Sequence, residues 1–409
     1  MALAFRLCIG KQPLNGLFNR LCKVPKYSNV QVACISGKMN RCRRSRPEPY
    51  PYKERDFTLY DMYENSYARY DENSRIIVVE GPIAAGKDAF AKELALELEM
   101  GYMPSQSFDI YFKDHSGFDI RSINHMLPEH AQVCDIERFL TNPHHKNIAA
   151  FQLAHYMMKL QAYVESLLHL LSTGEGVVLN RCLYSDFVFM KAMYNAGYIN
   201  RRCRNFYDKV VRATGTLCMK PHLVIYLDVP VNIVKERIKK RCIPYEVNSK
   251  VLTTKYLTDI ETIYKNEYLP LIENHAYVLM YDWSCGGDIN DIVEDIERID
   301  FEYTKLHPEK LEDWVFTNLT DLSSRRVIYS REERHRLMSE GFIDDIENEH
   351  MVLLGKDVEK KWQLIEENAP EYDEGYNPEV DKNLLFKNED KYTRGFPNVI
   401  SYKELEQLS

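Results

Sequence analysis

A glycine-rich loop near residue 81 has the residue types and spacing that bind phosphate. The apolar run 75–80 leads directly into Gly81-Pro-Ile-Ala-Ala-Gly86-Lys87, and a helical period follows. Glycines let backbone N–H groups turn inward around phosphate oxygens, and a helix that begins there adds the positive end of its dipole. The ammonium of Lys87 would reach the terminal phosphates. The spacing predicts a nucleotide phosphate site at Gly81, Gly86 and Lys87, and the alternative is a glycine turn with a purely structural role.

Asp88 departs from this phosphate-binding motif. The position after the lysine ordinarily carries Ser or Thr, whose hydroxyl binds Mg²⁺. A carboxylate can also bind Mg²⁺, but it adds negative charge where the phosphates already concentrate it. Asp88 therefore belongs to the expected phosphate site, with two interpretations open. Either the metal is held differently, or phosphoryl transfer has been lost.

The elements that position this loop alternate between strand and helix over the central part of the chain. Short apolar runs predict strands at 75–80, 177–179, 222–228 and 277–281. Apolar residues at helical spacing predict helices at 87–100, 151–171, 231–240 and 289–299, and a further one that runs through Met190. This alternation predicts an α/β fold with a doubly wound parallel sheet of about five strands.

Further motifs in the same region resemble those of the deoxyribonucleoside kinases. The motifs that carry the likeness are Glu80–Lys87, Phe151-Gln152, Asn180-Arg-Cys-Leu-Tyr-Ser-Asp186 and the arginine-bearing segment Glu236–Arg241. Together they are more specific than the glycine loop alone. The resemblance implies a P-loop, kinase-like domain over 73–300.

The resemblance also implies roles for individual side chains. Gln152 would hydrogen-bond a nucleobase edge, and Asp186 would help to select the base, with Lys159 where the family usually has arginine. The implied phosphate ligands are Arg181, Arg237 and Arg241. Structural alternatives remain: Asp186 could cap a helix, Gln152 could be a solvated helix residue, and the arginines could lie on an exposed face.

Several positions differ from the family's catalytic pattern. Ser105 stands where the family has a glutamate as general base, Asn180 replaces a glutamate that helps to hold Mg²⁺, and Ile243 replaces a later arginine of the lid. A serine does not accept a proton from a sugar hydroxyl as a carboxylate does. Loss of metal ligands removes charge compensation on which phosphoryl transfer depends. We expect no catalytic residues and no bound metal. The alternative is an active mitochondrial deoxynucleoside kinase with Asp88 as a metal ligand.

The two ends of the chain differ in charge from the central domain. Residues 1–47 contain ten Lys and Arg but no Asp or Glu, which predicts a mitochondrial transit peptide over 1–40, with a basic tail as the alternative. An N-terminal arm would follow over 41–72. The C-terminal extension 301–409 is charged, with few apolar clusters, and we expect it to be partly helical. It would wrap the domain or dock on partner subunits, and a disordered acidic tail is an equal alternative.

Composition limits the partners. The net charge of −8 argues against nucleic acid, because a nucleic-acid binder needs a surplus of Lys and Arg. No stretch approaches the roughly 18–20 apolar residues of a membrane span, so any membrane association would come through partner subunits. The cysteines show no spacing suited to zinc or an iron–sulfur cluster, and no NADH-type glycine fingerprint is present. We therefore expect no FAD, iron–sulfur cluster or zinc.

A kinase-like domain with altered catalytic positions, a presequence and an acidic extension resembles the kinase-like accessory subunits of mitochondrial respiratory complex I. The resemblance implies a non-catalytic role, on the matrix side of the inner membrane, in assembly or stability of the membrane arm. The implied partners are other complex I subunits and a purine nucleotide or deoxynucleotide. A free nucleotide-sensing protein of the matrix is a third interpretation.

Overall fold

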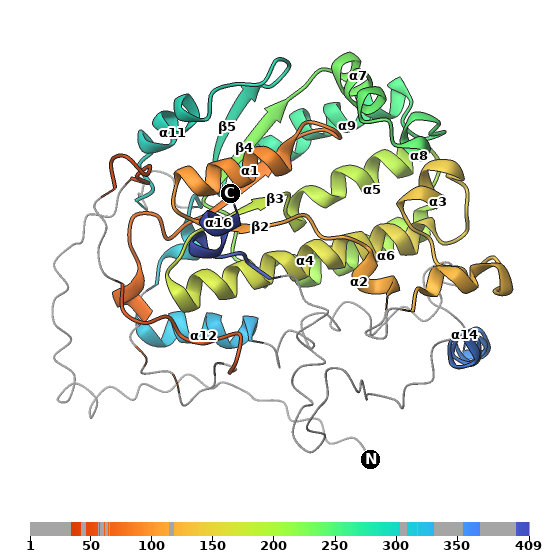
Figure 1. The fold of residues 1–409 in the computed structure, drawn as a ribbon, viewed down its shortest axis with the longest axis horizontal. Helices are drawn as coiled ribbons and strands as arrows, with labels where there is room; N and C mark the ends of the chain where they lie inside the picture. The colour runs from red at the N-terminus through yellow and green to blue at the C-terminus, as the bar shows by residue number, and fades with distance from the viewer. Residues whose placement is uncertain are drawn as a thin grey trace. The chain divides into compact units, whose positions relative to one another are not determined.

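The computed structural model describes residues 34–41, 46–55, 57, 61, 64, 66–113, 118–302, 309–316, 318–330, 355–368 and 398–408. A five-stranded sheet lies at the centre of this part of the chain (Figure 1). Its strands are β1 (Ile76–Glu80), β2 (Gly101–Met103), β3 (Val177–Asn180), β4 (Leu223–Asp228) and β5 (Tyr277–Asp282). The strand order is β2-β3-β1-β4-β5, and every pairing between neighbours is parallel. The predicted fold class is confirmed.

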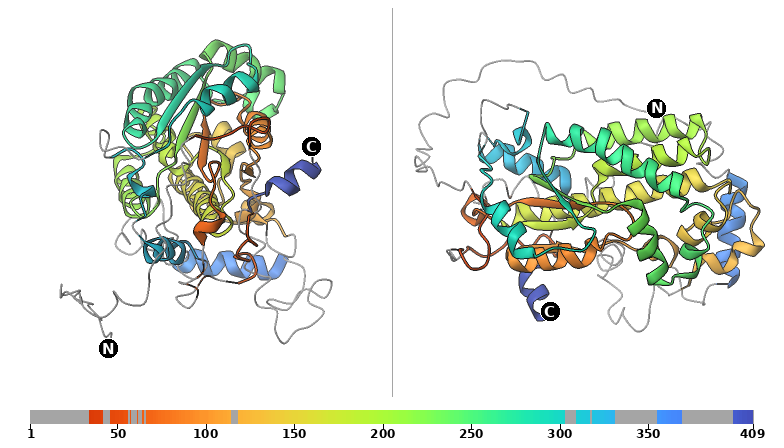
Figure 2. Two further views of the ribbon diagram at one scale, coloured as in Figure 1. Left: turned by 90° about the vertical axis from the view of Figure 1, so that its left-hand side faces the viewer. Right: turned by 90° about the horizontal axis from the view of Figure 1, so that it is seen from above.

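Helices cover both faces of the sheet, as a buried parallel sheet requires. Successive residues of β1 point to opposite faces, so Ile77 and Val79 belong to one apolar cluster while Ile76 and Val78 belong to another. Helices α1 (Lys87–Glu97) and α11 (Ile289–Glu297) cover the first face. The second face is covered by α4 (Ile148–Thr173), α5 (Asp186–Asn195), α6 (Arg201–Gly215) and α9 (Thr254–Ile263). The turned views of Figure 2 show helices on both sides of the sheet.

The described part of the chain also contains helices and turns outside these two layers. The remaining α-helices are α2 (Asp109–Phe112), α3 (Ile136–Thr141), α7 (Val231–Arg241), α8 (Pro244–Val247), α10 (Leu269–Glu273), α12 (Leu319–Tyr329), α14 (Gly355–Asn368) and α16 (Tyr402–Leu408). The 3₁₀ turns are η3 (Ser66–Arg69), η4 (Ile120–Met126), η5 (Leu183–Ser185) and η7 (Glu312–Trp314), and η6 (Tyr264–Tyr268) is a π-helical turn between α9 and α10. Within the described residues, no helix is both long and apolar enough to cross a membrane.

The described residues before the arm pack on the body of the domain. Ile35 is only 1% exposed and joins the cluster beneath α1 and α11. The guanidinium of Arg41 forms ion pairs with Asp71 at 2.6 Å and with Glu99 at 3.2 Å. The expected transit peptide otherwise falls on residues 1–33, which lie outside the described residues. A boundary near residue 40 stays a prediction, although it would separate Ile35 from the core in which it is buried.

The described parts of the C-terminal extension pack on the chain's own domain. Helix α12 lies against α4, and its Arg326 side chain is fully buried, pairs with Glu64 at 2.7 Å and lies over the ring of Phe57. Helix α14 contacts η4 through Leu364 and Ile365. Part of the extension therefore wraps the domain. Residues 331–354 and 369–397 lie outside the described residues.

The end of the chain closes one edge of the sheet. Ile400 pairs antiparallel with Tyr102 of the outer strand β2, through hydrogen bonds of 2.8 and 2.9 Å between their backbone N and O atoms. Helix α16 then lies beside α1 and β2 (Figure 1). An unpaired strand edge invites association with other chains, and Ile400 covers part of this one.

Candidate functional site

The glycine loop between β1 and α1 has the backbone geometry that its sequence predicts. Gly81 has φ of +149°, and a Cβ at that position would lie 2.7 Å from the carbonyl oxygen of Leu227, so β4 passes too close for any side chain. Gly86 has φ of +86° and precedes the first turn of α1. Left-handed conformations at Ala84 and Gly86 turn the chain sharply before the helix begins. The N-terminus of α1 therefore points its free N–H groups into the loop, as an anion site requires.

Lys87 is the cation of this loop. Its side chain is buried at 8% exposure, and its Nζ donates to the carbonyl oxygen of Pro82 at 2.6 Å. Burial, together with the positive charge of Arg181, lowers the pKa of Lys87 well below its usual value. A bound phosphate would supply the negative charge that this buried ammonium lacks.

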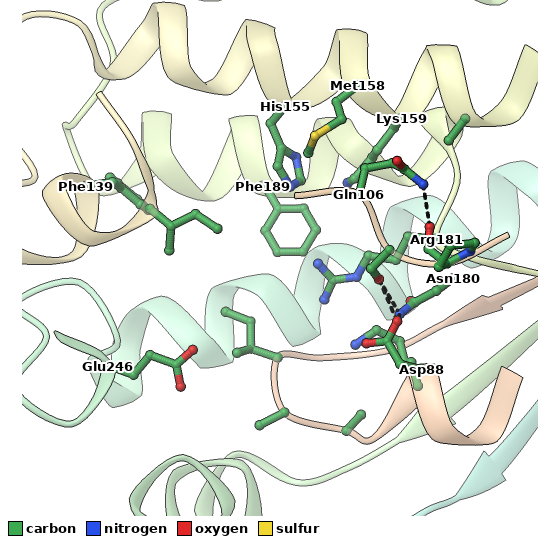
Figure 3. Close-up of a pocket in the computed structure, with 18 of the residues that line it drawn as sticks. Asp88, Gln106, Phe139, His155, Met158, Lys159, Asn180, Arg181, Phe189 and Glu246 are labelled. Carbon is green, nitrogen blue, oxygen red and sulfur yellow. Dashed lines mark hydrogen bonds between the residues drawn. The ribbon is translucent and has the colours of Figure 1, made fainter. Parts of the chain in front are cut away.

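A cavity of about 610 Å³ opens in front of the loop (Figure 3). Among the residues expected at a nucleotide site, those that line it are Gly86, Lys87, Asp88, Gln152, Lys159, Arg181 and Arg241. Gly81, Asp186 and Arg237 are not part of its wall. Away from the phosphate loop the wall is mostly apolar, with Phe139, Phe151, Met158, Phe189, Met193 and Tyr256. One end of the cavity thus suits phosphates, and the other suits a flat ring system.

Asp186 lies behind the apolar end and organises its polar side chains. It is fully buried and accepts hydrogen bonds from Gln152 Nε2 at 2.8 Å and Lys159 Nζ at 2.8 Å. Two further groups hydrogen-bond to the same carboxylate: His155 Nδ1 at 3.0 Å and the Tyr207 hydroxyl at 2.7 Å. Burial alone would raise the pKa of Asp186, but Lys159 and His155 hold it well below its usual value. An ionised carboxylate only accepts hydrogen bonds, so the Gln152 amide must turn its nitrogen to Asp186, which leaves its oxygen as the acceptor for a ligand.

His155 and Tyr207 were not predicted as members of the site. His155 lies three residues after Gln152 and four before Lys159, so these three side chains share one face of α4, and that spacing could have revealed it. Burial, and then the charge of Lys159, lower the pKa of His155, so the imidazole is neutral near pH 7. Tyr207 comes from α6, for which the sequence analysis predicted no helix.

The three predicted arginines lie in different settings. Arg181 has φ of +62°, donates to the carbonyl oxygen of Gly81 at 3.1 Å and lies 4.5 Å from the ring centre of Phe189. Arg241 lines the cavity and forms an ion pair with Glu246 at 2.9 Å. Arg237 instead donates to the backbone carbonyls of Ala85, Trp283 and Ser284, at 2.6 to 3.2 Å. In this conformation Arg237 holds α7 to the loop, and Arg181 and Arg241 face the cavity.

Three of the altered positions, Asp88, Ser105 and Asn180, meet in one hydrogen-bonded cluster, and Ile243 lies apart from it at the start of α8. Asp88 Oδ1 accepts from the Ser105 hydroxyl and from Asn180 Nδ2, both at 2.7 Å, and Asn180 Nδ2 also donates to Ser105 Oγ at 2.8 Å (Figure 3). The hydroxyl of Tyr102 approaches the same carboxylate oxygen at 3.4 Å. Burial would raise the pKa of Asp88, but hydrogen bonds from Ser105 and Asn180 outweigh it and lower the pKa. The carboxylate is therefore ionised and held by side chains from β2, β3 and the segment after β2.

The fold and the geometry of the phosphate loop define a protein with a P-loop kinase fold, and comparison with known families agrees. The sequence model of the family described as deoxynucleoside kinase matches residues 77–320, which is more than half of the chain. This chain belongs to the deoxynucleoside kinase family.

Its similarity to particular members is more specific. It is 40% identical over 247 residues to the mouse (Mus musculus) protein NADH dehydrogenase [ubiquinone] 1 alpha subcomplex subunit 10, mitochondrial, covering 60% of this chain and 67% of that protein. The bovine (Bos taurus) protein of the same name is 36% identical over 246 residues, covering 59% of this chain and 69% of the bovine protein. A deoxyguanosine kinase of Dictyostelium discoideum is 22% identical over 242 residues, covering 58% of this chain and 74% of that kinase.

Proposed function

We propose that this chain is an accessory, non-catalytic subunit of mitochondrial respiratory complex I that retains a nucleotide-binding pocket. The observation that carries the proposal is its 36–40% identity, over two thirds of their length, to proteins named as subunits of NADH dehydrogenase (ubiquinone). It would lie on the matrix side of the inner membrane and support assembly or stability of the membrane arm. The C-terminal extension 301–409 is the proposed contact with neighbouring subunits.

The geometry of the site supports a role without phosphoryl transfer. The position of the family's general base is Ser105, whose hydroxyl donates to Asp88 at 2.7 Å and therefore has no basic role. The cavity is present, and Lys87, Arg181, Arg241 and Gln152 all line it. A purine nucleotide or deoxynucleotide in this cavity would add stability to the folded subunit, because it binds only the folded state.

Native electrophoresis of detergent-solubilised mitochondria tests the subunit proposal. We expect this chain to co-migrate with NADH dehydrogenase activity, and we expect its depletion to reduce the assembled complex. Migration at the mass of a monomer, with complex I intact after depletion, would refute the proposal. That outcome would favour a free nucleotide-sensing protein.

An active deoxynucleoside kinase is the second candidate, because Gly81, Gly86 and Lys87 of the phosphate loop are present and a protein named deoxyguanosine kinase is similar. We expect no transfer of phosphate from ATP to any of the four deoxynucleosides above the background of a Lys87→Ala variant. Turnover that the purified wild-type chain shows and Lys87→Ala lacks would establish the kinase instead. The Ser105→Glu variant should be assayed in parallel, because it restores a carboxylate at the position of the general base.

A further inference from the structure

The cluster of Asp88, Ser105 and Asn180 bears on the magnesium ion that a kinase-like phosphate site ordinarily holds. We infer that this pocket binds the phosphates of its nucleotide without a divalent cation, an inference that rests on the nucleotide pocket of the proposed function. Its basis is the way in which the three side chains use one another's hydrogen-bonding groups.

Asp88 Oδ1 and Ser105 Oγ, two of the oxygens that Mg²⁺ could use, already form hydrogen bonds with protein donors. Mg²⁺ requires near-octahedral oxygen ligands at about 2.0–2.1 Å. Asp88 Oδ1 accepts from Ser105, Asn180 and Tyr102, so a metal at this atom would displace those donors. The Ser105 hydroxyl gives its one proton to Asp88 and accepts from Asn180.

Asn180 is the least suitable of the three positions for a cation. Its amide nitrogen must face the ionised Asp88, because a carboxylate accepts and does not donate hydrogen bonds. Its amide oxygen is buried, and no hydrogen-bond partner for it is found within the described residues. The oxygens of the cluster that accept no hydrogen bond within the described residues are Asp88 Oδ2 and the neutral amide oxygen of Asn180, so the cluster offers a cation only one carboxylate oxygen. Within the part of the chain that the structure describes, no group of three His, Cys, Asp or Glu could hold a metal ion.

Protein cations stand where the metal's charge would be needed. Lys87, Arg181 and Arg241 line the cavity together with the carboxylates of Asp88 and Glu246, and Lys87 and Arg181 are the cations that contact the phosphate loop. Tyr102, Ser105 and Asn180 direct three hydrogen bonds to Asp88 Oδ1, and these compensate part of the carboxylate's charge. The free N–H groups at the start of α1 add a further positive partial charge. These groups can hold a phosphate without a bridging metal ion.

Titration calorimetry on the purified full chain tests this inference directly. ATP, GTP, dATP and dGTP serve as probes, each in excess EDTA and in millimolar MgCl₂. We expect at least one probe to bind with dissociation constants in the two buffers that agree within about threefold. Tightening by Mg²⁺ of about tenfold or more, which is about 1.4 kcal/mol, would overturn the inference.

A pair of substitutions should make nucleotide binding depend on Mg²⁺, a dependence that we expect the wild type to lack. Asp88→Ser with Asn180→Glu places a hydroxyl in the first turn of α1 and a carboxylate on β3, and we expect Mg²⁺ to tighten nucleotide binding to this variant at least tenfold. Asp291→Ser is the matched control, because Asp291 also lies in the first turn of a sheet-covering helix, α11, and is exposed. It should bind as the wild type does in both buffers. A double variant that folds but binds equally well in both buffers would contradict the assignment of these positions.

A second measurement does not depend on any variant. Mn²⁺ added to the nucleotide-loaded wild type should give the paramagnetic resonance spectrum of Mn²⁺ with free nucleotide or water, without an immobilised, protein-bound species. An immobilised species in proportion to bound nucleotide would overturn the inference and leave the nucleotide pocket standing. Failure of all four nucleotides to bind in either buffer would remove the pocket itself, together with this inference.

Discussion

Replacing Asp186 by asparagine tests the charge network behind the apolar end of the cavity. The substitution keeps the shape of the side chain and removes its charge. Asp186 is fully buried, and Lys159, whose side chain is 10% exposed, lies 2.8 Å from it. The ammonium of Lys159 would then have an amide where its carboxylate partner stood. Four donors converge on Asp186, so the asparagine must also present its own N–H₂ group to some of them.

The expected loss follows from this burial. Removing one partner of a buried ion pair costs about 3–5 kcal/mol, because the other charge stays desolvated without compensation. We therefore expect Asp186→Asn to lower the free energy of unfolding by about 3–5 kcal/mol at pH 7. Asp208→Asn is the control: Asp208 lies on the same helix as Tyr207, is 41% exposed and pairs with Arg204 at 3.8 Å. An exposed pair of this kind contributes about 0.5 kcal/mol or less.

Urea unfolding of the purified full chain supplies the measurement, and a double-mutant cycle sharpens it. Adding Lys159→Met to Asp186→Asn removes the stranded ammonium, so the double variant should be more stable than the sum of the single losses predicts. We expect a coupling energy of about 1 kcal/mol or more. A loss below about 1 kcal/mol for Asp186→Asn, or additive single losses, would refute the view that Asp186 and Lys159 act as a desolvated pair.

The pH dependence of this stability loss independently checks the direction in which the pKa of Asp186 is shifted. The pKa of Asp186 is lowered in the folded state, so its contribution is complete above the ordinary value of 3.8 and is lost as the pH falls towards the folded-state pKa. The stability gap between wild type and Asp186→Asn should therefore persist from pH 7 to about pH 5 and shrink below about pH 4. A stability difference that grows on acidification would contradict a lowered pKa of Asp186 in the folded state.

Three further predictions concern the loop and the two ends of the chain. Arg326→Met should lower the free energy of unfolding by about 1.5–3 kcal/mol, because it removes the charge-assisted hydrogen bonds of a fully buried guanidinium to Glu64 and Ser66. Arg298→Met, at a 71% exposed side chain, should change it little in the same urea experiment. Mass spectrometry of the mature chain should place its N-terminus before Cys34, because the following residues are packed on the body, and a terminus after Arg41 would contradict this packing. Gly81→Ala should lose nucleotide-induced thermal stabilisation, because its Cβ would meet a carbonyl oxygen at 2.7 Å; unchanged stabilisation would show that the loop can rearrange.

Strands with long apolar runs were predictable, and the short one was not. The residues of β1, β3, β4 and β5 form continuous apolar runs, and the structure confirms each of them. Strand β2 has only three residues and begins with glycine, so it carries neither a run nor an alternation. The predicted helix 87–100 ends at Glu97, because the chain turns at Glu99, which has a positive φ, to enter β2.

Motifs indicated the members of the site but not the contacts between them. Asp88, Ser105 and Asn180 were each noticed as a separate departure from a family pattern. Their mutual hydrogen bonds depend on β2 and β3 lying side by side in the sheet, next to the start of α1, and no local periodicity encodes that neighbourhood. Similarly, Arg237 matches a lid motif, but its three backbone acceptors come from two distant segments.

The pairing of Ile400 with Tyr102 has a consequence for how the chain is made. Synthesis runs from the N-terminus, so β2 exists long before the residues that cover its edge leave the ribosome. The two backbone hydrogen bonds to Ile400 can form only after almost the whole chain is present. Until then the edge of the outer strand can pair with other nascent chains, and a chaperone that covers this edge would prevent such association. Premature termination at or before codon 400 would permanently remove the pairing with Tyr102.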